Sequence, residues 1–150
     1  MSKKNNQPEY FTGKNHDYYC VLTTPEGETF TGKAVCAEAD YEFESESVGF
    51  TIAESRALLQ YLSRVRDSKK NQLKALKHLL HSCDRSKYYN PKNYLERRLF
   101  SHIHLLEDDI EAINQMISFT KANVFEYLSS MNAFHKSVKE RRASTNSESN

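Results

Sequence analysis

The chain has 150 residues, a formal net charge of +1 and a hydrophobic content of 38%, and its mean hydropathy is −0.76. Such a chain has material for one domain, or for one domain with an oligomerisation element, but not for a thick core. No stretch approaches the roughly 18 apolar residues of a membrane span, and the first seven residues lack the apolar run of a signal peptide. Three widely spaced cysteines are typical of reduced thiols. We therefore expect a soluble, cytoplasmic protein.

The charge is unevenly distributed along the chain. Residues 26–46 contain seven acids and one base, a net charge of −6, whereas residues 56–98 contain twelve bases and three acids, a net charge of +9. The sequence thus predicts an acidic segment and a basic helical surface. A second acidic run, at 107–111, is expected to face either solvent or the basic run 69–77. Long DNA or RNA is an unfavoured partner, because the total charge is nearly neutral and no nucleic-acid-binding motif is present.

The first third of the chain predicts a flexible segment and a β-hairpin. Residues 1–15 are polar, and we expect them to be flexible. Residues 17–36 hold two segments rich in β-branched and aromatic side chains, separated by the turn residues Thr24-Pro25-Glu26-Gly27. An isolated hairpin is marginally stable, so it has to pack on helices or pair with strands of another subunit. The acidic residues 37–47 are interpreted as a solvated connector, with a third strand or a surface directed at a basic partner region as alternatives.

A first long helix is predicted over about 51–82. Thr51-Ile52-Ala53-Glu54 has the pattern of a capping box, in which the threonine hydroxyl and the glutamate carboxylate satisfy free backbone N–H groups. An apolar stripe follows to about His81. It is interrupted by seven consecutive polar residues at 66–72, where we expect the helix to be bent, wet or broken.

A second, longer helix is predicted over about 91–142, within a single domain spanning 16–142. Asn90-Pro91 is a helix start signal, because asparagine caps free N–H groups and proline lacks the N–H that would be unpaired there. Its apolar residues recur in alternating steps of four and three, which is typical of a helix packed along another helix. These residues are Leu99, Ile103, Leu106, Ile110, Ile113, Ile117 and, past a polar Thr120, Val124. The tail 143–150 is predicted to be disordered.

The predicted fold class is therefore α+β. A small N-terminal antiparallel β-hairpin or sheet precedes a long antiparallel two-helix hairpin that resembles a coiled coil. The second helix would span about 78 Å and the first about 46 Å at 1.5 Å per residue. The surplus length still carries apolar residues, and a single hairpin covers only about 15–20 Å. We therefore expect a homo-oligomer.

The hinge between the two helices combines arginine, tyrosine and asparagine side chains. Arginine pairs with phosphate oxygens, tyrosine rings stack on bases, and an amide reads a base edge. The N-terminus of the second helix adds backbone N–H groups. This mixture suits a small anionic nucleotide, although tyrosines that seal the hairpin end beside solvated charges explain it as well. The candidate ligand-binding residues here are Arg85, Tyr88, Tyr89, Asn90, Arg97 and Arg98.

Arg56 is a further candidate ligand-binding residue. It lies in the first turns of the predicted first helix, where the helix dipole favours acids rather than bases. A residue placed against its local preference is often kept for a ligand or a carboxylate. An ion pair with Glu54, or with an acid of the segment 38–46, is an equally good explanation.

Metal binding and catalysis are not expected. His78, His81 and Cys83 lie close together, but His102 and His104 point to different sides of a helix. Structural zinc sites need three or four converging ligands. The sequence also has no nucleophile–base signature, no glycine-rich phosphate loop and no paired-carboxylate motif. We therefore predict neither a metal nor a cofactor, no catalytic residues, and a protein that is not an enzyme.

Two parts of the sequence carry a resemblance to known proteins. They are Thr31-Gly32-Lys33-Ala34-Val35-Cys36, Asp40, Phe43, Ser45-Glu46, Gly49 and Ile52-Ala53-Glu54-Ser55-Arg56-Ala57, and then Ser86-Lys87-Tyr88-Tyr89-Asn90-Pro91-Lys92-Asn93-Tyr94. These parts resemble small proteins encoded by phages of Gram-positive bacteria, and the resemblance covers about residues 17–115. With a small sheet and two long helices, the chain is most similar to the anti-Thoeris sponge family.

The resemblance implies a phage anti-defence protein in the cytoplasm of the infected host. Such proteins sequester nucleotide immune signals, cyclic ADP-ribose isomers among them, without cleaving them, and they assemble from dimers into higher oligomers. Cyclic oligonucleotides are a second ligand class that this function would cover. Arg56 and the Tyr-Asn-Pro hinge are the positions carried over, whereas Arg97 and Arg98 are proposed on charge alone.

Two alternatives to the sponge function remain open. One is a protein-binding inhibitor of a host defence complex, of the anti-CRISPR type, that uses charged helical faces. The other is a nucleic-acid-binding phage accessory protein. For the sponge, geometry adds one constraint. Arg56 and the hinge would lie roughly 40 Å apart within one antiparallel hairpin, so a pocket built from both would lie between chains.

Overall fold

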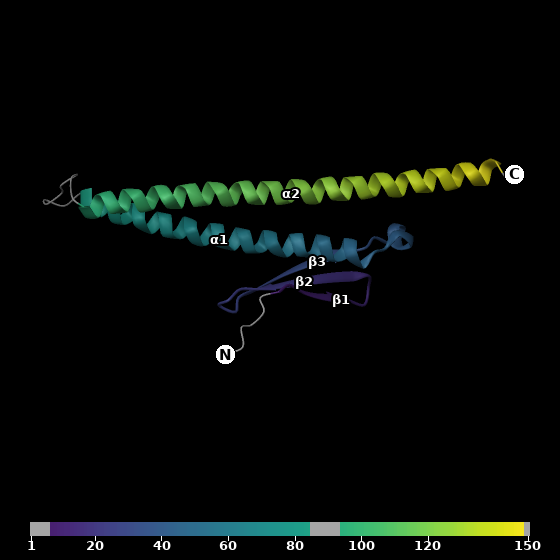
Figure 1. The fold of residues 1–150 in the computed structure, drawn as a ribbon, viewed down its shortest axis with the longest axis horizontal. Coiled ribbons are helices and arrows are strands. Elements are labelled where there is room, and N and C mark those ends of the chain that lie inside the picture. The colour runs from purple at the N-terminus through teal and green to yellow at the C-terminus, as the bar shows by residue number, and fades with distance from the viewer. Residues whose placement is uncertain (1–6, 85–93, 149–150) are drawn as a thin grey trace. The chain divides into compact units, whose positions relative to one another are not determined.

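The computed structural model describes residues 7–84 and 94–148 (Figure 1). The predicted α+β class is confirmed at the level of a small antiparallel sheet followed by two long packed helices. The described elements are β1 (Glu9–Thr12), β2 (Asp17–Thr23), β3 (Thr29–Val35), the 3-10 helix η1 (Glu38–Phe43), α1 (Glu46–Asp84) and α2 (Tyr94–Glu148). None of the described helices combines the length and apolar character that a membrane span needs.

Two compact units make up the chain, and each is described by itself. Unit 1 comprises residues 1–60 and 119–150, and unit 2 comprises residues 61–118. Both long helices contribute residues to both units. Unit 1 also holds the sheet and η1, whereas unit 2 is helical throughout its described part.

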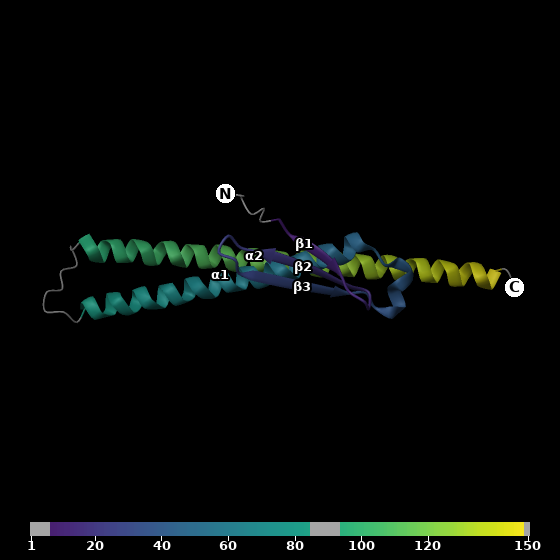
Figure 2. The same cartoon turned by 90° about the horizontal axis from the view of Figure 1, so that it is seen from below.

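The sheet of unit 1 has the order β1-β2-β3, with both neighbouring pairs antiparallel (Figure 2). The predicted hairpin is confirmed as β2 and β3. The N-terminal segment predicted to be flexible instead includes β1, in which Tyr10 and Phe11 are opposite Cys20 and Tyr19 of β2. The third strand therefore comes from the N-terminus, and the segment 37–47 holds η1 rather than a strand. Sequence patterning missed β1 because only four residues pair, all of them exposed.

One face of the sheet packs closely on α1. Side chains of β2 and β3 alternate between buried and more exposed positions, as a half-buried sheet requires. At Gly32 a Cβ atom would collide with the backbone carbonyl oxygen of Ala53, and it would also lie 2.6 Å from the backbone nitrogen of Ala57. Ala53 and Ala57 are both fully buried. Glycine on the strand and alanines on the helix thus permit a backbone-to-backbone approach that larger side chains would prevent.

The start of α1 differs from the prediction. The helix begins at Glu46, and the Ser45 carbonyl accepts a hydrogen bond from the Gly49 N–H at 3.0 Å. Thr51 lies inside the helix, where its hydroxyl donates to the Ser47 carbonyl at 2.7 Å. The capping-box prediction is therefore wrong, because that hydroxyl is used within the helix and does not cap it. The helix also continues unbroken through residues 66–72 and ends at Asp84. Residues 66–72 stay helical because the lysines, arginine and glutamine among them are good helix formers.

Unit 2 consists of antiparallel segments of the two helices. The predicted seam is confirmed over its six members from Leu99 to Ile117, which are buried, whereas Val124, the last predicted member, is half-buried. The buried members are Leu99, Ile103, Leu106, Ile110, Ile113 and Ile117. Lys69 pairs with Asp109 at 3.2 Å, and Lys77 pairs with Glu107 at 3.3 Å. The acidic run of α2 therefore faces the basic run of α1, as one of the two predicted arrangements had it.

The C-terminal end of α2 also differs from the prediction. The described helix begins at Tyr94, and the predicted Asn90-Pro91 start lies outside the described residues. Its C-terminus reaches Glu148, so most of the tail predicted to be disordered is helical. Hydroxyl groups there bond back along the helix, with Thr145 donating to the Arg141 carbonyl at 3.0 Å. No glycine or proline follows residue 94 to end the helix earlier.

Candidate functional site

The structure places Arg56 at the contact between α1 and β3. Its Nη1 atom donates to the carbonyl oxygen of Lys33 at 2.6 Å. Glu54, one of the partners considered for it, accepts a hydrogen bond from the Tyr10 hydroxyl at 3.1 Å. Arg56 therefore has a structural use in holding the helix to the sheet. Its role as a ligand contact stays a prediction.

The predicted hinge residues are only partly described. Arg85, Tyr88, Tyr89 and Asn90 lie outside the described residues. Arg97 and Arg98 are exposed in the first turns of α2, next to Glu96, which is buried. These two arginines belong to unit 2, whereas Arg56 belongs to unit 1. The hinge site therefore also stays a prediction.

Unit 1 contains a pocket that sequence reasoning missed. Its volume is about 230 Å³, and it is lined by residues of β2, β3, η1, α1 and α2, with the intervening chain. Apolar side chains such as Val48, Ile52 and Leu128 form its walls, and Phe43 and His135 contribute aromatic rings. These two rings are stacked, with their centroids 4.3 Å apart and their planes at 9°. The pocket therefore has an apolar interior beside an aromatic pair.

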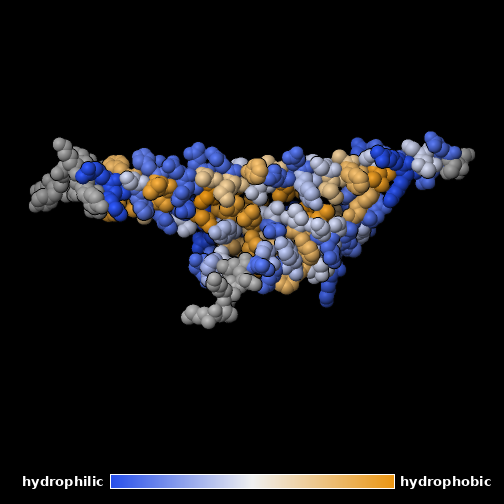
Figure 3. All heavy atoms as spheres, viewed as in Figure 1, coloured by the Kyte–Doolittle hydropathy of each residue, from blue (hydrophilic) through white to orange (hydrophobic). Residues whose placement is uncertain are grey.

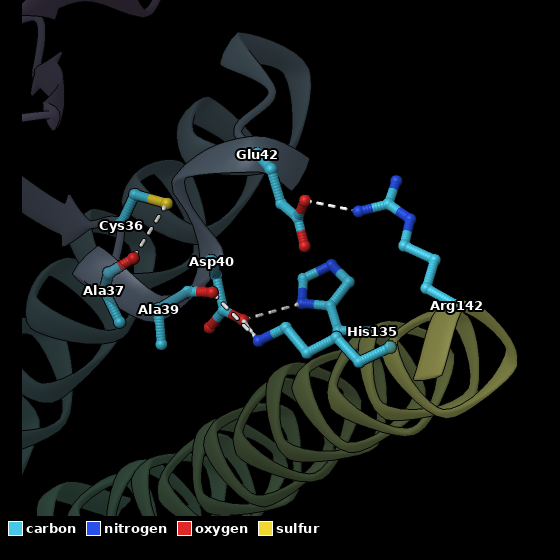
Figure 4. Close-up of polar contacts among 8 residues, drawn as sticks. Cys36, Ala37, Ala39, Asp40, Glu42, His135 and Arg142 are labelled. Atoms are coloured by element: carbon cyan, nitrogen blue, oxygen red, sulfur yellow. Dashed lines mark hydrogen bonds and ion pairs between the residues drawn. The ribbon is translucent and has the colours of Figure 1, made fainter. Parts of the chain in front are cut away.

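Next to the aromatic pair, η1 contacts three basic side chains of α2 (Figure 4). We call His135, Lys139 and Arg142 the basic face of α2. Asp40 lies 3.3 Å from His135 Nδ1 and 3.5 Å from Lys139 Nζ. Lys139 also donates to the Ala39 carbonyl at 2.9 Å.

The contact is completed by Arg142. Its Nη1 donates to the Glu42 carboxylate at 2.5 Å. Lys139 and Arg142 also lie over the Phe43 ring, at 5.9 and 5.8 Å from its centroid. The acidic segment is thus directed at a basic region, as one prediction proposed, and that region belongs to the same chain.

His135 is held mainly by stacking. Its side chain is only 12% exposed, and among the described residues neither ring nitrogen makes a hydrogen bond of normal geometry. Asp40 is within ion-pair distance of Nδ1 but does not satisfy it. Within the described ranges, both ring nitrogens are buried without a hydrogen-bond partner, which is uncommon for buried polar atoms.

The C-terminal end of η1 is anchored to the sheet through Glu44. This carboxylate accepts hydrogen bonds from the Tyr18 hydroxyl at 2.5 Å and, on its other oxygen, from His16 Nδ1 at 2.6 Å. The bond to Glu44, with burial, raises the pKa of Tyr18 to about 12. The same two bonds, led by that from Tyr18, lower the pKa of Glu44. His16 also stacks on Tyr41, with centroids 3.8 Å apart.

The pocket also has a thiol among its lining residues. Cys36 lines the pocket, but burial raises the pKa of its thiol, and so do the nearby Glu44 and Asp40 carboxylates. A thiol with a raised pKa is a poor nucleophile at neutral pH. Within the ranges 7–84 and 94–148, no three histidine, cysteine or carboxylate side chains converge so as to hold a metal ion. A stacked ring beside cations is the arrangement that binds planar anions.

The sequence contained both halves of this contact but not their pairing. Acids and aromatics alternate in the segment 37–47, and bases follow one another at 135–142. The two segments lie about 100 residues apart, as the Glu42–Arg142 pair shows. No local pattern reports a contact at that separation.

A second surface feature of unit 1 is exposed phenylalanine on α2. Phe119, Phe125 and Phe134 have 69%, 75% and 59% of their surface exposed. In Figure 3, hydrophobic residues reach the surface among hydrophilic ones in this helix. Large exposed apolar side chains often mark interaction surfaces.

Comparisons with protein-family models, with curated proteins and with solved structures found no match to this chain.

Proposed function

We propose that this protein binds and sequesters a small nucleotide without cleaving it, and that it is a phage anti-defence protein of the kind represented by the anti-Thoeris sponges. The observation that carries the proposal is the basic face of α2 beside the pocket of unit 1. His135 presents a ring on which another ring already stacks at 4.3 Å. Lys139 and Arg142 follow it on the same helix and bind carboxylates. A ring and two cations are the groups that recognise a base and its phosphates.

The volume of the pocket suggests that only part of the ligand lies inside it. A pocket of about 230 Å³ is smaller than the roughly 300–1,000 Å³ of sites that enclose a whole ligand. It suits one planar ring, with the charged part of the ligand at the rim. Stacking of a base on an aromatic side chain contributes about 1–3 kcal/mol, and arginine binds phosphate oxygens through two parallel hydrogen bonds.

The predicted homo-oligomer and the predicted hinge residues are kept within this proposal. Cyclic ADP-ribose isomers are the ligand class implied by the resemblance, with cyclic oligonucleotides second. The predicted residues would contribute in an assembly where one pocket lies between chains; they are Arg56, Arg85, Tyr88, Tyr89, Asn90, Arg97 and Arg98. The basic face of α2 is a separate set of residues, and variants at Arg142 and at Arg56 distinguish these two candidate sites.

The test is a thermal-shift panel of cyclic ADP-ribose isomers, cyclic dinucleotides, linear ADP-ribose and duplex DNA. We expect a rise in Tm with at least one cyclic nucleotide and none with duplex DNA. The bound nucleotide should be recovered intact after heat release. Arg142→Gln should abolish the shift, whereas Lys136→Gln should retain it. Lys136 is a matched control because it lies on the same helix and, within the part of the chain that the structure describes, forms its ion pair with the exposed Glu140 at 4.0 Å.

Three outcomes bear against parts of the proposal. The absence of a shift with every nucleotide would overturn it. Recovery of a cleaved nucleotide would replace a sponge with an enzyme. A shift that survives Arg142→Gln but is lost in Arg56→Ala would move the site to the predicted inter-subunit pocket.

A protein-binding inhibitor of a host defence complex is the second candidate function. The exposed phenylalanines of α2 favour it, because they supply apolar contact area for a protein surface. This function predicts no Tm shift with any nucleotide. It also predicts that a defined host protein co-purifies with the wild type and is lost with Phe125→Ser, while the far-ultraviolet circular dichroism stays unchanged.

A further inference from the structure

We propose that η1 is an internal mimic of the nucleotide, so that a ligand bearing a ring and two phosphates binds the basic face of α2 by displacing η1. This inference rests on the proposed function and adds to it the class of ligand and the way in which access is controlled.

The mimicry lies in the correspondence between three groups of η1 and three groups of α2. Phe43 lays a flat ring on His135, at an interplanar angle of 9°. The Asp40 carboxylate lies 3.5 Å from Lys139 Nζ, and the Glu42 carboxylate accepts from Arg142. One ring and two anions are thus presented together by a helix of six residues.

The contact is weak enough to be exchanged. The Arg142–Glu42 pair is solvated, with side chains 59% and 44% exposed, and the Lys139–Asp40 pair is partly exposed, at 43% and 29%. Exposed pairs of this kind typically contribute about 0–1 kcal/mol each. Moreover, η1 has no buried residue and no side-chain hydrogen bond at its N-cap. The remaining contacts are the stack of Phe43 on His135 and the hydrogen bond from Lys139 to the Ala39 carbonyl, and a ligand with its own ring and anions would replace both.

The two ends of η1 allow such a release without loss of the sheet. Ala37 and Glu44 flank it with extended backbone, at φ −67°, ψ 143° and φ −57°, ψ 131°. Glu44 itself is held by Tyr18 and His16. Residues 38–43 can therefore leave α2 while Glu44 stays bound to the sheet.

A diphosphate is the ligand that would compete best. Each phosphate offers more charge and more acceptor oxygens than the carboxylate it would replace. Two carboxylates, two residues apart, hold two separate cations, so a ligand with one phosphate could replace only one of them. Displacement of Phe43 would also free the His135 ring for a base.

The experiment measures binding of cyclic ADP-ribose, which has two phosphates, and of cyclic AMP, which has one, by isothermal titration calorimetry. Removing the mimic should tighten binding, because each ion pair that is lost no longer competes with the ligand. Glu42→Gln should lower the Kd for cyclic ADP-ribose by about 5-fold, and the double variant Asp40→Asn/Glu42→Gln should lower it by about 30-fold. The gain for cyclic AMP should be smaller. Glu140→Gln removes the same charge from α2 itself, where Glu140 pairs with Lys136, and should change neither Kd.

Hydrogen exchange supplies a second readout. Ligands normally slow exchange where they bind, but here cyclic ADP-ribose should speed the exchange of the amides of residues 38–43. These include the Asp40 N–H, which now donates to the Ala37 carbonyl at 2.9 Å.

The outcomes separate this inference from the function on which it rests. If the wild type binds cyclic ADP-ribose and the charge-neutral variants bind it equally or more weakly, η1 is part of the site and not its mimic, and the inference is wrong. If Glu140→Gln tightens binding as much as Glu42→Gln, the effect is general electrostatics and the inference also fails. If neither the wild type nor any variant binds either nucleotide, the inference is overturned, whereas the proposed function is overturned only if every nucleotide of the thermal-shift panel also fails to bind.

Discussion

Units 1 and 2 are built from segments of the same two helices but are stabilised in different ways. In unit 2 a repetitive seam of leucine and isoleucine on α2 is buried, and exposed ion pairs lie beside it. In unit 1 the backbone of β3 approaches that of α1 at Gly32, and aromatic and charged side chains meet at specific distances. In unit 2, repetitive packing is therefore sufficient to hold α1 and α2 together. A binding surface needs residues that each have one particular partner.

The largest effect is expected at the close contact of unit 1. Gly32→Val should destabilise the protein by more than about 3 kcal/mol, because the new side chain would collide with the backbone at Ala53, which cannot move as a flexible side chain would. Urea unfolding followed by circular dichroism measures this. Thr31→Val, on the exposed neighbouring position of β3, is the control and should change stability by less than about 0.5 kcal/mol.

In unit 2 the effect should depend on the face of α2. Ile110→Ala removes a buried side chain and should cost about 2–5 kcal/mol. Leu105→Ala, at a position 63% exposed, should cost less than about 0.5 kcal/mol. Equal losses at the two positions in urea unfolding would show that the seam does not have the orientation described.

The polar network of unit 1 should give a smaller but pH-dependent effect. Tyr18→Phe should cost about 1–2 kcal/mol at pH 7, since it removes a hydrogen bond to a charged carboxylate. The pKa of Tyr18 is raised from 10.0 to about 12. Its contribution is therefore complete below pH 10 and is lost as the pH rises toward 12. The wild type should lose stability over that range, and Tyr18→Phe should lose less.

At acid pH, the same network stabilises the protein through Glu44, and this contribution is lost as the pH falls rather than as it rises. The pKa of Glu44 is lowered from 4.5, so its contribution is present above that value and is lost as the pH falls through the lowered pKa. Thermal unfolding across pH 2–12 measures both flanks. A Tyr18→Phe profile parallel to that of the wild type above pH 10 would contradict the assignment.

The smallest effect is expected at the ion pairs of unit 2. Lys69→Gln, Asp109→Asn and the double variant form a double-mutant cycle. Its coupling energy should be below about 1 kcal/mol, because the Asp109 side chain is 54% exposed and that of Lys69 is 30% exposed. A larger coupling energy would mean that unit 2 relies on specific polar pairs as unit 1 does, and it would weaken the contrast between the two.

The seam and the hairpin were predictable because their signals are local. Alternating steps of four and three between Leu99 and Ile117 determine one face of a helix, whatever partner covers it. The turn at Thr24–Gly27 likewise joins strands that are adjacent in sequence. The start of α1 was missed because Thr51 has the right side chain for a cap but uses its hydroxyl within the helix. Its intrinsic preference could not reveal which of two backbone partners it would bond.

Sequence patterns alone therefore predicted the α+β class, the seam of α2 and the sign of the charge in each charged run, since each depends on residues within a few turns of one another. Only the tertiary structure decided which acids meet which bases, and that β1 completes the sheet. It also brought Phe43, Asp40 and Glu42 to His135, Lys139 and Arg142, across about 100 residues of chain. Local sequence patterns cannot predict that pairing, because the two segments contact each other only after the sheet and helices have packed together.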